Sequence, residues 1–267
     1  MTSMWALRQP EEAARVPIAT GWTEARAVLA LWAAAGAIAA AHVLPSQVMA
    51  VIGVAVVHGG LLAAALVWGG IGLAEASLVF AMLALARALV VVHPLGALAY
   101  LAVPLWLGRL ALRGRLTRVG LAPPWPWGAV LIGALAGAAL ALHLITSASR
   151  TLGYGVRFHL ETFVPALGYD LGASVLSAEL LFRGALLQHL WRRWNFGLAL
   201  SSASALATLR YVVDPYVGTI ELRVGAAVYM ALLAILNGVL YRWSGSLLPG
   251  LAAAGVFFAC YRLLAIG

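Results

Sequence analysis

Long apolar runs separated by short polar segments dominate this chain, and they restrict it to very few folds. A run of about 20 apolar residues is the length that crosses the hydrocarbon core of a membrane as a helix. Of the 267 residues 64% are hydrophobic and 10% are charged. The runs are continuous and do not alternate with period two, which excludes a membrane β-barrel. We predict an all-α, polytopic transmembrane helical bundle with runs at 27–43, 48–69, 71–92, 95–112, 126–146, 164–190, 197–213, 224–243 and 247–266.

The second and third runs almost touch, so the prediction is eight to nine spans. The stretch RGRLTRVGLAPPWPW that follows the fourth run is basic and rich in proline, as expected of a boundary. We therefore predict an N-terminal cytoplasmic segment at 1–24, a four-span region at 25–112 and a five-span core at 113–267. The segment 147–163 is expected to be a plain loop, with an interfacial helix as the alternative.

The distribution of arginine predicts the topology. All 17 basic residues are arginine and the formal net charge is +8. They lie mainly at the ends of apolar runs, so they indicate membrane orientation and exclude nucleic-acid binding. Eight fall in segments that would share the cytoplasm with the N-terminus: Arg8, Arg15, Arg113, Arg115, Arg118, Arg192, Arg193 and Arg242. The absence of lysine, with abundant alanine and glycine, is typical of a GC-rich genome, and we expect the cytoplasmic (inner) membrane of a bacterium.

Glu179 and Arg183 stand out because they lie inside an apolar run, in the phrase SAELLFRG. A charged group at membrane depth is costly, so it is expected to be paired and to suggest a functional site. At i,i+4 the two side chains share a helix face and can neutralise each other. Arg210, in SSASALATLRY, either reaches Glu179 as a third member or extends to the outer interface.

Other polar residues near membrane depth have ordinary interpretations. Glu75 and Asp170 fall near the ends of their runs, where interfacial water is expected to reach them. His58, His93 and His143 are single histidines, which in such helices are usually hydrogen-bonding core residues. No two histidines are spaced at i,i+3 or i,i+4, so no helical metal pair is predicted.

Three phrases in the second half resemble one family in order and spacing. They are AELLFRGALLQHLWRRW, SSASALATLRY and LLAILNGVLYRWSGSLLPGLAAAGVFFA. They are similar to the three motif regions of the CPBP family, the type II CAAX prenyl proteases and bacteriocin-processing (Abi) membrane proteases. The resemblance covers roughly residue 113 to the C-terminus and implies a CAAX-protease-like core.

The resemblance also marks six motif positions where the family has a polar residue, besides the phenylalanine position of the second region. The family pattern EExxxR falls on Ala178, Glu179 and Arg183, so one of its two glutamates is an alanine here. The pattern FxxxH falls on Leu206 and Arg210. The histidine and asparagine positions of the third region fall on Ala254 and Phe258.

The family chemistry needs a glutamate to activate water, with the histidines and asparagine as metal ligands or oxyanion stabilisers. Glu179 is the one acid retained, and an arginine-paired carboxylate is a poorer base. The resemblance therefore implies an inactive pseudoprotease with no cofactor, acting as a scaffold, chaperone or subunit for another membrane protein or a lipid-modified peptide.

An intramembrane endopeptidase with an altered site, using zinc, is the alternative. It predicts that Glu179→Gln would abolish cleavage and leave folding intact. A transporter is a third class, against which the runs show no paired halves with broken helices.

Overall fold

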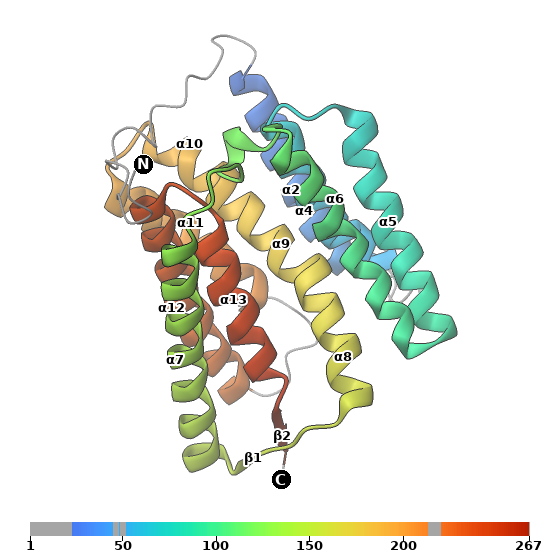
Figure 1. Ribbon diagram of the computed structural model, residues 1–267, viewed down its shortest axis with the longest axis vertical. Coiled ribbons are helices and arrows are strands. Elements are labelled where there is room, and N and C mark those ends of the chain that lie inside the picture. Colours follow the sequence, from blue (N-terminus) through green and yellow to red (C-terminus); the bar gives the residue numbers. More distant parts are fainter. Residues whose placement is uncertain (1–22, 45–47, 49–51, 213–219, 267) are drawn as a thin grey trace.

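Nine helical passes and one small sheet make up the described residues of this computed structural model, which are 23–44, 48, 52–212 and 220–266 (Figure 1). Three passes change helix type along their length: a π-helical turn follows the α-helical residues 52–54 in the second, a 3-10 helix opens the fourth, and π-helical turns divide the sixth. The passes are α2 (Thr23–Val43), η1 with α4 (Ala55–Gly59, Gly60–Trp68), α5 (Leu73–Val92), η2 with α6 (Pro94–Leu101, Ala102–Leu112), α7 (Trp127–Leu152), the chain α8, η4, α9, η5 and α10 (Leu160–Tyr169, Asp170–Ser174, Val175–Ala178, Glu179–Leu187, Gln188–Trp191), α11 (Phe196–Val212), α12 (Ile220–Ser244) and α13 (Leu248–Tyr261).

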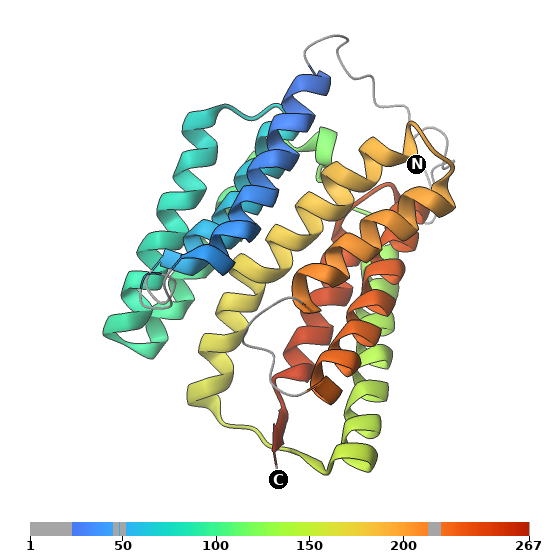
Figure 2. The ribbon, with the colours of Figure 1, turned by 180° about the vertical axis from the view of Figure 1, so that it is seen from behind.

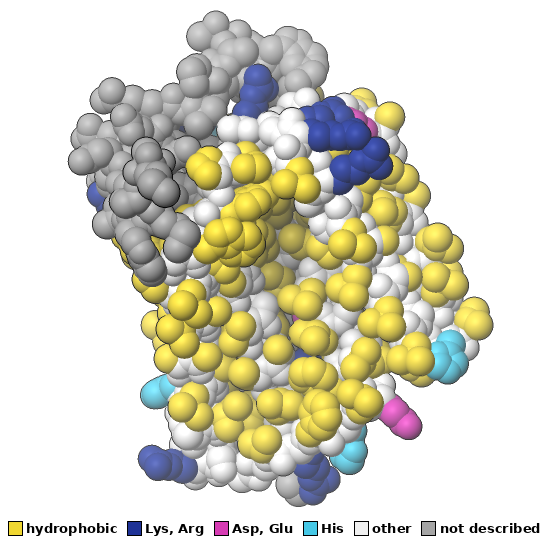
Figure 3. All heavy atoms as spheres, in the orientation of Figure 1, with side chains coloured by type: hydrophobic (Ala, Val, Ile, Leu, Met, Phe, Trp, Pro, Cys, Tyr) yellow, Lys and Arg dark blue, Asp and Glu magenta, His cyan; other side chains and the backbone are white. Residues whose placement is uncertain are grey.

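Length and apolar composition make this a multi-pass membrane protein. Within the described ranges four helices are long and apolar enough to cross a membrane: Leu73–Val92, Pro94–Leu112, Trp127–Leu152 and Val224–Ser244. Large apolar side chains such as Trp32, Leu105 and Leu135 are more than half exposed. Figure 3 shows apolar side chains over the middle of the molecule and charged ones toward its two ends. Such a surface fits lipid, because soluble monomers rarely expose large contiguous apolar patches.

The nine predicted runs agree with the nine passes, although several ends differ by four or more residues. The segment 147–163 is not a plain loop, because α7 continues to Leu152 and α8 begins at Leu160. Between them β1 (Tyr154–Val156) pairs antiparallel with β2 (Leu264–Ile266), so the last helix stops at Tyr261. Gly153, with a φ of 70°, ends α7 in a left-handed conformation that favours glycine.

The long sixth pass lies between two groups of helices, as the front and rear views agree (Figures 1 and 2). On one side are α2 to α6, and on the other are α7 and α11 to α13. Close approach is possible because small residues meet the backbone of the neighbouring helix; a Cβ at Gly172 would overlap the backbone of Tyr100. The division at residue 113 stays a prediction.

The most extensive helix pairing joins α7 to α13. Gly133, Gly137 and Ala141 are buried along one face of α7 at intervals of four residues. A Cβ at Gly133 would overlap the backbone of Pro249, and one at Gly137 would overlap that of Ala253. This spacing of small residues is the usual basis of close helix packing in membranes.

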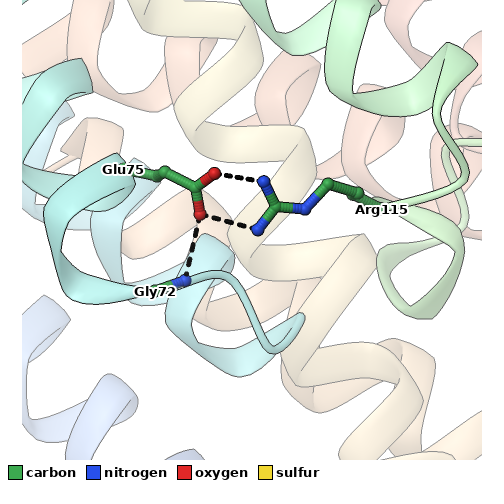
Figure 4. Close-up of polar contacts among 3 residues, drawn as sticks. All are labelled: Gly72, Glu75 and Arg115. Carbon is green, nitrogen blue, oxygen red and sulfur yellow. Dashed lines mark hydrogen bonds and ion pairs between the residues drawn. The ribbon is translucent and has the colours of Figure 1, made fainter.

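One end of the bundle carries a bidentate ion pair between helices. Arg115, just after α6, binds both carboxylate oxygens of Glu75, with Nη2 2.7 Å from Oε2 (Figure 4). Glu75 also accepts a hydrogen bond from the Gly72 amide at the start of α5. Hydrogen bonding to Glu75 raises the pKa of the Arg115 guanidinium above its usual value, so Arg115 keeps its charge. Glu75 is partly exposed, as predicted for an interfacial residue.

The same end gathers the other predicted cytoplasmic loops. The amide of Leu247, before α13, donates to the carbonyl of Gly120, which lies in the loop after α6. The Arg242 guanidinium, at the end of α12, lies 5.9 Å from the Trp191 ring and 4.4 Å from the Phe196 ring. The predicted cytoplasmic arginine segments that follow residue 112 therefore share one end, whereas Arg8 and Arg15 lie outside the described residues. Which side of the membrane this end faces stays a prediction.

Candidate functional site

A small cavity of about 10 Å³, enough for about one water molecule, lies between α9, η5, α11, α12 and α13. Its lining is almost entirely apolar, and the two charged side chains in it are those of Glu179 and Arg183. The other lining residues are Val175, Ala178, Ala207, Tyr211, Met230, Leu233, Ala234, Ala254 and Phe258.

Glu179 is held by two neighbours through a single oxygen. Its Oε1 accepts a hydrogen bond of 2.8 Å from Asn237 Nδ2 on α12 and lies 3.3 Å from Arg183 Nη1. Glu179 and Arg183 are 3% and 4% exposed, and Asn237 is 1% exposed, so water does not screen these contacts. The predicted pairing of Glu179 with Arg183 is therefore present.

Two acceptor atoms of this cluster remain without a partner among the described residues. They are Glu179 Oε2 and Asn237 Oδ1. Gly250 on α13 packs beside both side chains, since a Cβ there would lie 3.3 Å from Oε2 and 3.2 Å from the Asn237 Cβ. Buried acceptors of this kind usually bind water or another donor.

Five of the six motif positions lie in the cavity wall. Ala178, Glu179 and Arg183 come from the sixth pass, and Ala254 and Phe258 come from α13. The structure thus brings together residues that are more than 70 positions apart in the chain.

The second motif region is oriented differently. Leu206 is 48% exposed on the lipid face of α11, and Arg210 is not part of the cavity wall. Ala207 and Tyr211, each one residue later, occupy that wall. Successive residues on a helix point about 100° apart, so a shift of one position decides which side chain faces the cavity.

Arg210 matches neither predicted alternative: it does not contact Glu179, and its guanidinium contacts His58 and Tyr211. Its Nη2 lies 2.9 Å from His58 Nδ1, and its Cζ lies 4.9 Å from the centre of the Tyr211 ring. His58 comes from η1 in the N-terminal region. The imidazole also contacts the sixth pass, with Nδ1 2.8 Å from Ser177 Oγ and Nε2 2.6 Å from the Tyr169 hydroxyl.

The three single histidines form hydrogen bonds, as predicted, but only His58 is a core residue, since His93 and His143 are exposed. His58 is buried in the network just described, and His143 Nδ1 on α7 lies 2.8 Å from the Tyr229 hydroxyl on α12. His93 is exposed and accepts a hydrogen bond from the Leu95 amide at the start of η2.

The expectation for Asp170 is wrong. Asp170 is 1% exposed and does not contact interfacial water. Arg262, just after α13, donates to it through Nε (2.7 Å to Oδ2) and Nη2 (2.8 Å to Oδ1). The arginine lies in the turn before β2, and this position is set by the β1–β2 pairing that the sequence did not reveal.

Asn237 is the site residue that sequence reasoning missed. The available signal is that it interrupts the apolar stretch MALLAILNGVL of α12. A polar side chain at membrane depth is expected to bond to another helix. Tyr169 and Ser177 were also missed, because hydroxyl groups are common in membrane helices and carry little signal.

The donor set around the cavity does not fit a zinc ion. The wall supplies one carboxylate already bonded to arginine and asparagine, one phenol and one thioether, whereas zinc sites use several histidine, cysteine or carboxylate ligands. Among the described residues no group of three His, Cys, Asp or Glu side chains has the arrangement to hold a metal.

Comparison with known families gives one match, and it coincides with this site. Residues 161–259 match the family described as type II CAAX prenyl endopeptidase Rce1-like. This region is an Rce1-like domain. It extends from the start of α8 to near the end of α13 and contains the whole cavity wall. No curated protein and no solved structure is similar enough to count as a match.

Proposed function

We propose that the Rce1-like domain of this chain is a pseudoprotease, which binds a partner in its cavity and does not cleave it. The partner would be a helix of another membrane protein or a lipid-modified peptide, and the chain would act as its scaffold, chaperone or subunit. The proposal includes the cytoplasmic membrane of a bacterium as the location, with the N-terminus and the basic end in the cytoplasm, because positive residues favour that side.

The observation that carries the proposal is the state of the cavity wall. Hydrolysis requires a base to activate water and donors to hold the developing oxyanion. Here Ala178 and Ala254 supply methyl groups at two motif positions, and Phe258 supplies a ring at a third. The one carboxylate, Glu179, is bonded to a permanent cation and to Asn237.

The cavity wall is mostly apolar, so a partner that enters by moving its helices apart would meet apolar side chains. Two small residues at motif positions, Ala178 and Ala254, line the cavity. Two other small residues of α13 do not, because Ala253 packs against α7 and Gly255 packs against Leu171. The cavity is thus bordered by the methyl groups of two motif positions, which can contact a partner without needing a hydrogen bond from it.

The test is purification of the tagged full chain from its native membrane in a mild detergent, followed by mass spectrometry of bound molecules. A stoichiometric membrane protein or lipidated peptide supports the proposal. The variant Ala254→Leu, which fills the cavity, should lose it. Ala139→Leu on the exposed face of α7 is the matched control and should keep it.

An occupant that survives Ala254→Leu would contradict the cavity as the binding site. Because enlarging a buried side chain can itself destabilise a protein by about 1–3 kcal/mol, both variants are first compared by thermal unfolding. If Ala254→Leu does not fold, the smaller change Ala178→Val replaces it and tests the same wall.

One observation favours the alternative of an active endopeptidase. Glu179 Oε2 is buried, belongs to a residue of the cavity wall and has no partner among the described residues. A water bound there would have a potential base beside it. For this function, membranes with Glu179→Gln should lose a set of peptide termini that wild type produces, while the variant still folds. An unchanged set of termini would exclude it.

A further inference from the structure

The charges around the His58–Arg210 network do not balance within the described residues. Three ion pairs among the described residues join one cation to one anion each: Glu75 with Arg115, Glu179 with Arg183, and Asp170 with Arg262. Arg210 takes part in none of the three. A lone guanidinium beside apolar helices is costly and by default suggests a function.

The imidazole of His58 cannot serve as the missing anion. A guanidinium has only donors, so Arg210 Nη2 at 2.9 Å donates to His58 Nδ1, which therefore carries no proton. The proton is then on Nε2, which donates to the Tyr169 hydroxyl. The ring is neutral, and it orients Arg210 without compensating its charge.

Arg210 has a donor to spare. Its Nη1 is buried and has no hydrogen-bond partner among the described residues. An unpaired donor on a charged group leaves an unfavourable state that a bound anion would relieve.

We propose that Arg210 binds an oxyanion, a carboxylate or phosphate, carried by a membrane lipid. A guanidinium is suited to such groups because its planar donors match two oxygens at once. The source is lipid because α11 borders the bilayer here: Leu206 and Leu209 are 48% and 52% exposed. The Arg210 side chain as a whole is partly exposed, although Nη1 is buried, so an anion that reaches Nη1 from the membrane must displace neighbouring side chains.

This site is separate from the cavity wall and does not depend on whether Glu179 is catalytic. It also includes a residue from outside the Rce1-like domain, since His58 belongs to η1. The N-terminal region therefore completes the proposed site.

The test measures binding to the purified full chain in dodecyl maltoside by native mass spectrometry and thermal unfolding. The probes are phosphatidylglycerol, oleate, phosphatidylcholine and inorganic phosphate. We expect wild type to bind the two anionic lipids better than phosphatidylcholine. Arg210→Gln should weaken this preference roughly ten- to hundredfold, the range for a hydrogen bond to a charged group. Arg242→Gln, at the basic end, is the control and should retain it.

Several results would overturn the proposal. One is equal binding of anionic and zwitterionic lipid by wild type, and another is an unchanged preference in Arg210→Gln. Competition by inorganic phosphate at the concentration of the lipid would assign the site to a free anion. If wild type shows no preference for anionic lipid and Asp214→Asn does, the counter-ion of Arg210 is Asp214, which lies outside the described residues. If Arg210→Gln does not fold, Arg210→Lys should bind more weakly than wild type, and equal binding would refute the proposal.

Discussion

Replacing Glu179 by glutamine should destabilise the protein by leaving Arg183 charged and unpaired in the interior. The two side chains are 3% and 4% exposed, and their atoms lie 3.3 Å apart. Removal of one partner from a buried ion pair costs about 3–5 kcal/mol, mainly because the remaining charge has no compensation. The glutamine can still accept the hydrogen bond from Asn237, so the loss of stability measures the effect of removing the negative charge.

The reverse change should cost less. In Arg183→Met the carboxyl of Glu179 can take up a proton and become neutral, whereas a guanidinium cannot lose one. The double variant Glu179→Gln/Arg183→Met removes both charges, and buried pairs replaced together are often neutral or stabilising. We expect its free energy of unfolding to lie within about 1–2 kcal/mol of wild type.

The assay is unfolding of the four proteins in mixed micelles by titration with sodium dodecyl sulfate, followed by tryptophan fluorescence. The expected order of stability places wild type and the double variant first, then Arg183→Met, then Glu179→Gln. A Glu179→Gln protein as stable as wild type would refute the reasoning and would agree with an enzyme whose glutamate is dispensable for folding.

Three further changes test the packing and the other ion pairs by the same unfolding assay. Gly137→Ala places a Cβ against the backbone of Ala253 and should cost about 1–3 kcal/mol, whereas Gly108→Ala on α6, with open space around it, should stabilise by up to about 1 kcal/mol; equal effects would contradict the α7–α13 contact. Asp170→Asn leaves the partly exposed Arg262 without its anion and should cost about 1.5–3 kcal/mol, and no loss would argue against the bidentate pair. Glu75→Gln should have a small effect that disappears in high salt, and a large salt-independent loss would contradict its exposed position.

The fold was largely predictable because membrane spans follow from the length of apolar runs. The nine runs correspond to nine passes within the described residues, although several ends were displaced, among them those of the fifth and ninth runs. The β1–β2 sheet was not predictable, because it pairs residues 154–156 with residues 264–266 through three residues each. Strands this short have no periodicity to detect.

The candidate site was predictable only in part, because apolar runs do not reveal how a helix is rotated. Glu179 and Arg183 were found from their spacing on one helix. Their contact with Asn237 depends on which face α12 turns toward η5. Arg210 illustrates the same limit: the residue lies at a motif position, yet its guanidinium contacts His58 from a different region of the chain.

The pairing of α7 with α13 has a consequence for how the protein is made. The two helices that fit together most closely are separated by more than a hundred residues, between Gly137 and Ala253. At roughly 5–20 residues per second, the ribosome needs on the order of 5 to 20 s to add that stretch. During that time α7 is in the membrane without the helix it fits, and its glycine face is open to lipid, to the insertion machinery or to wrong neighbours. The α7 face therefore stays uncovered until α13 has been made and inserted.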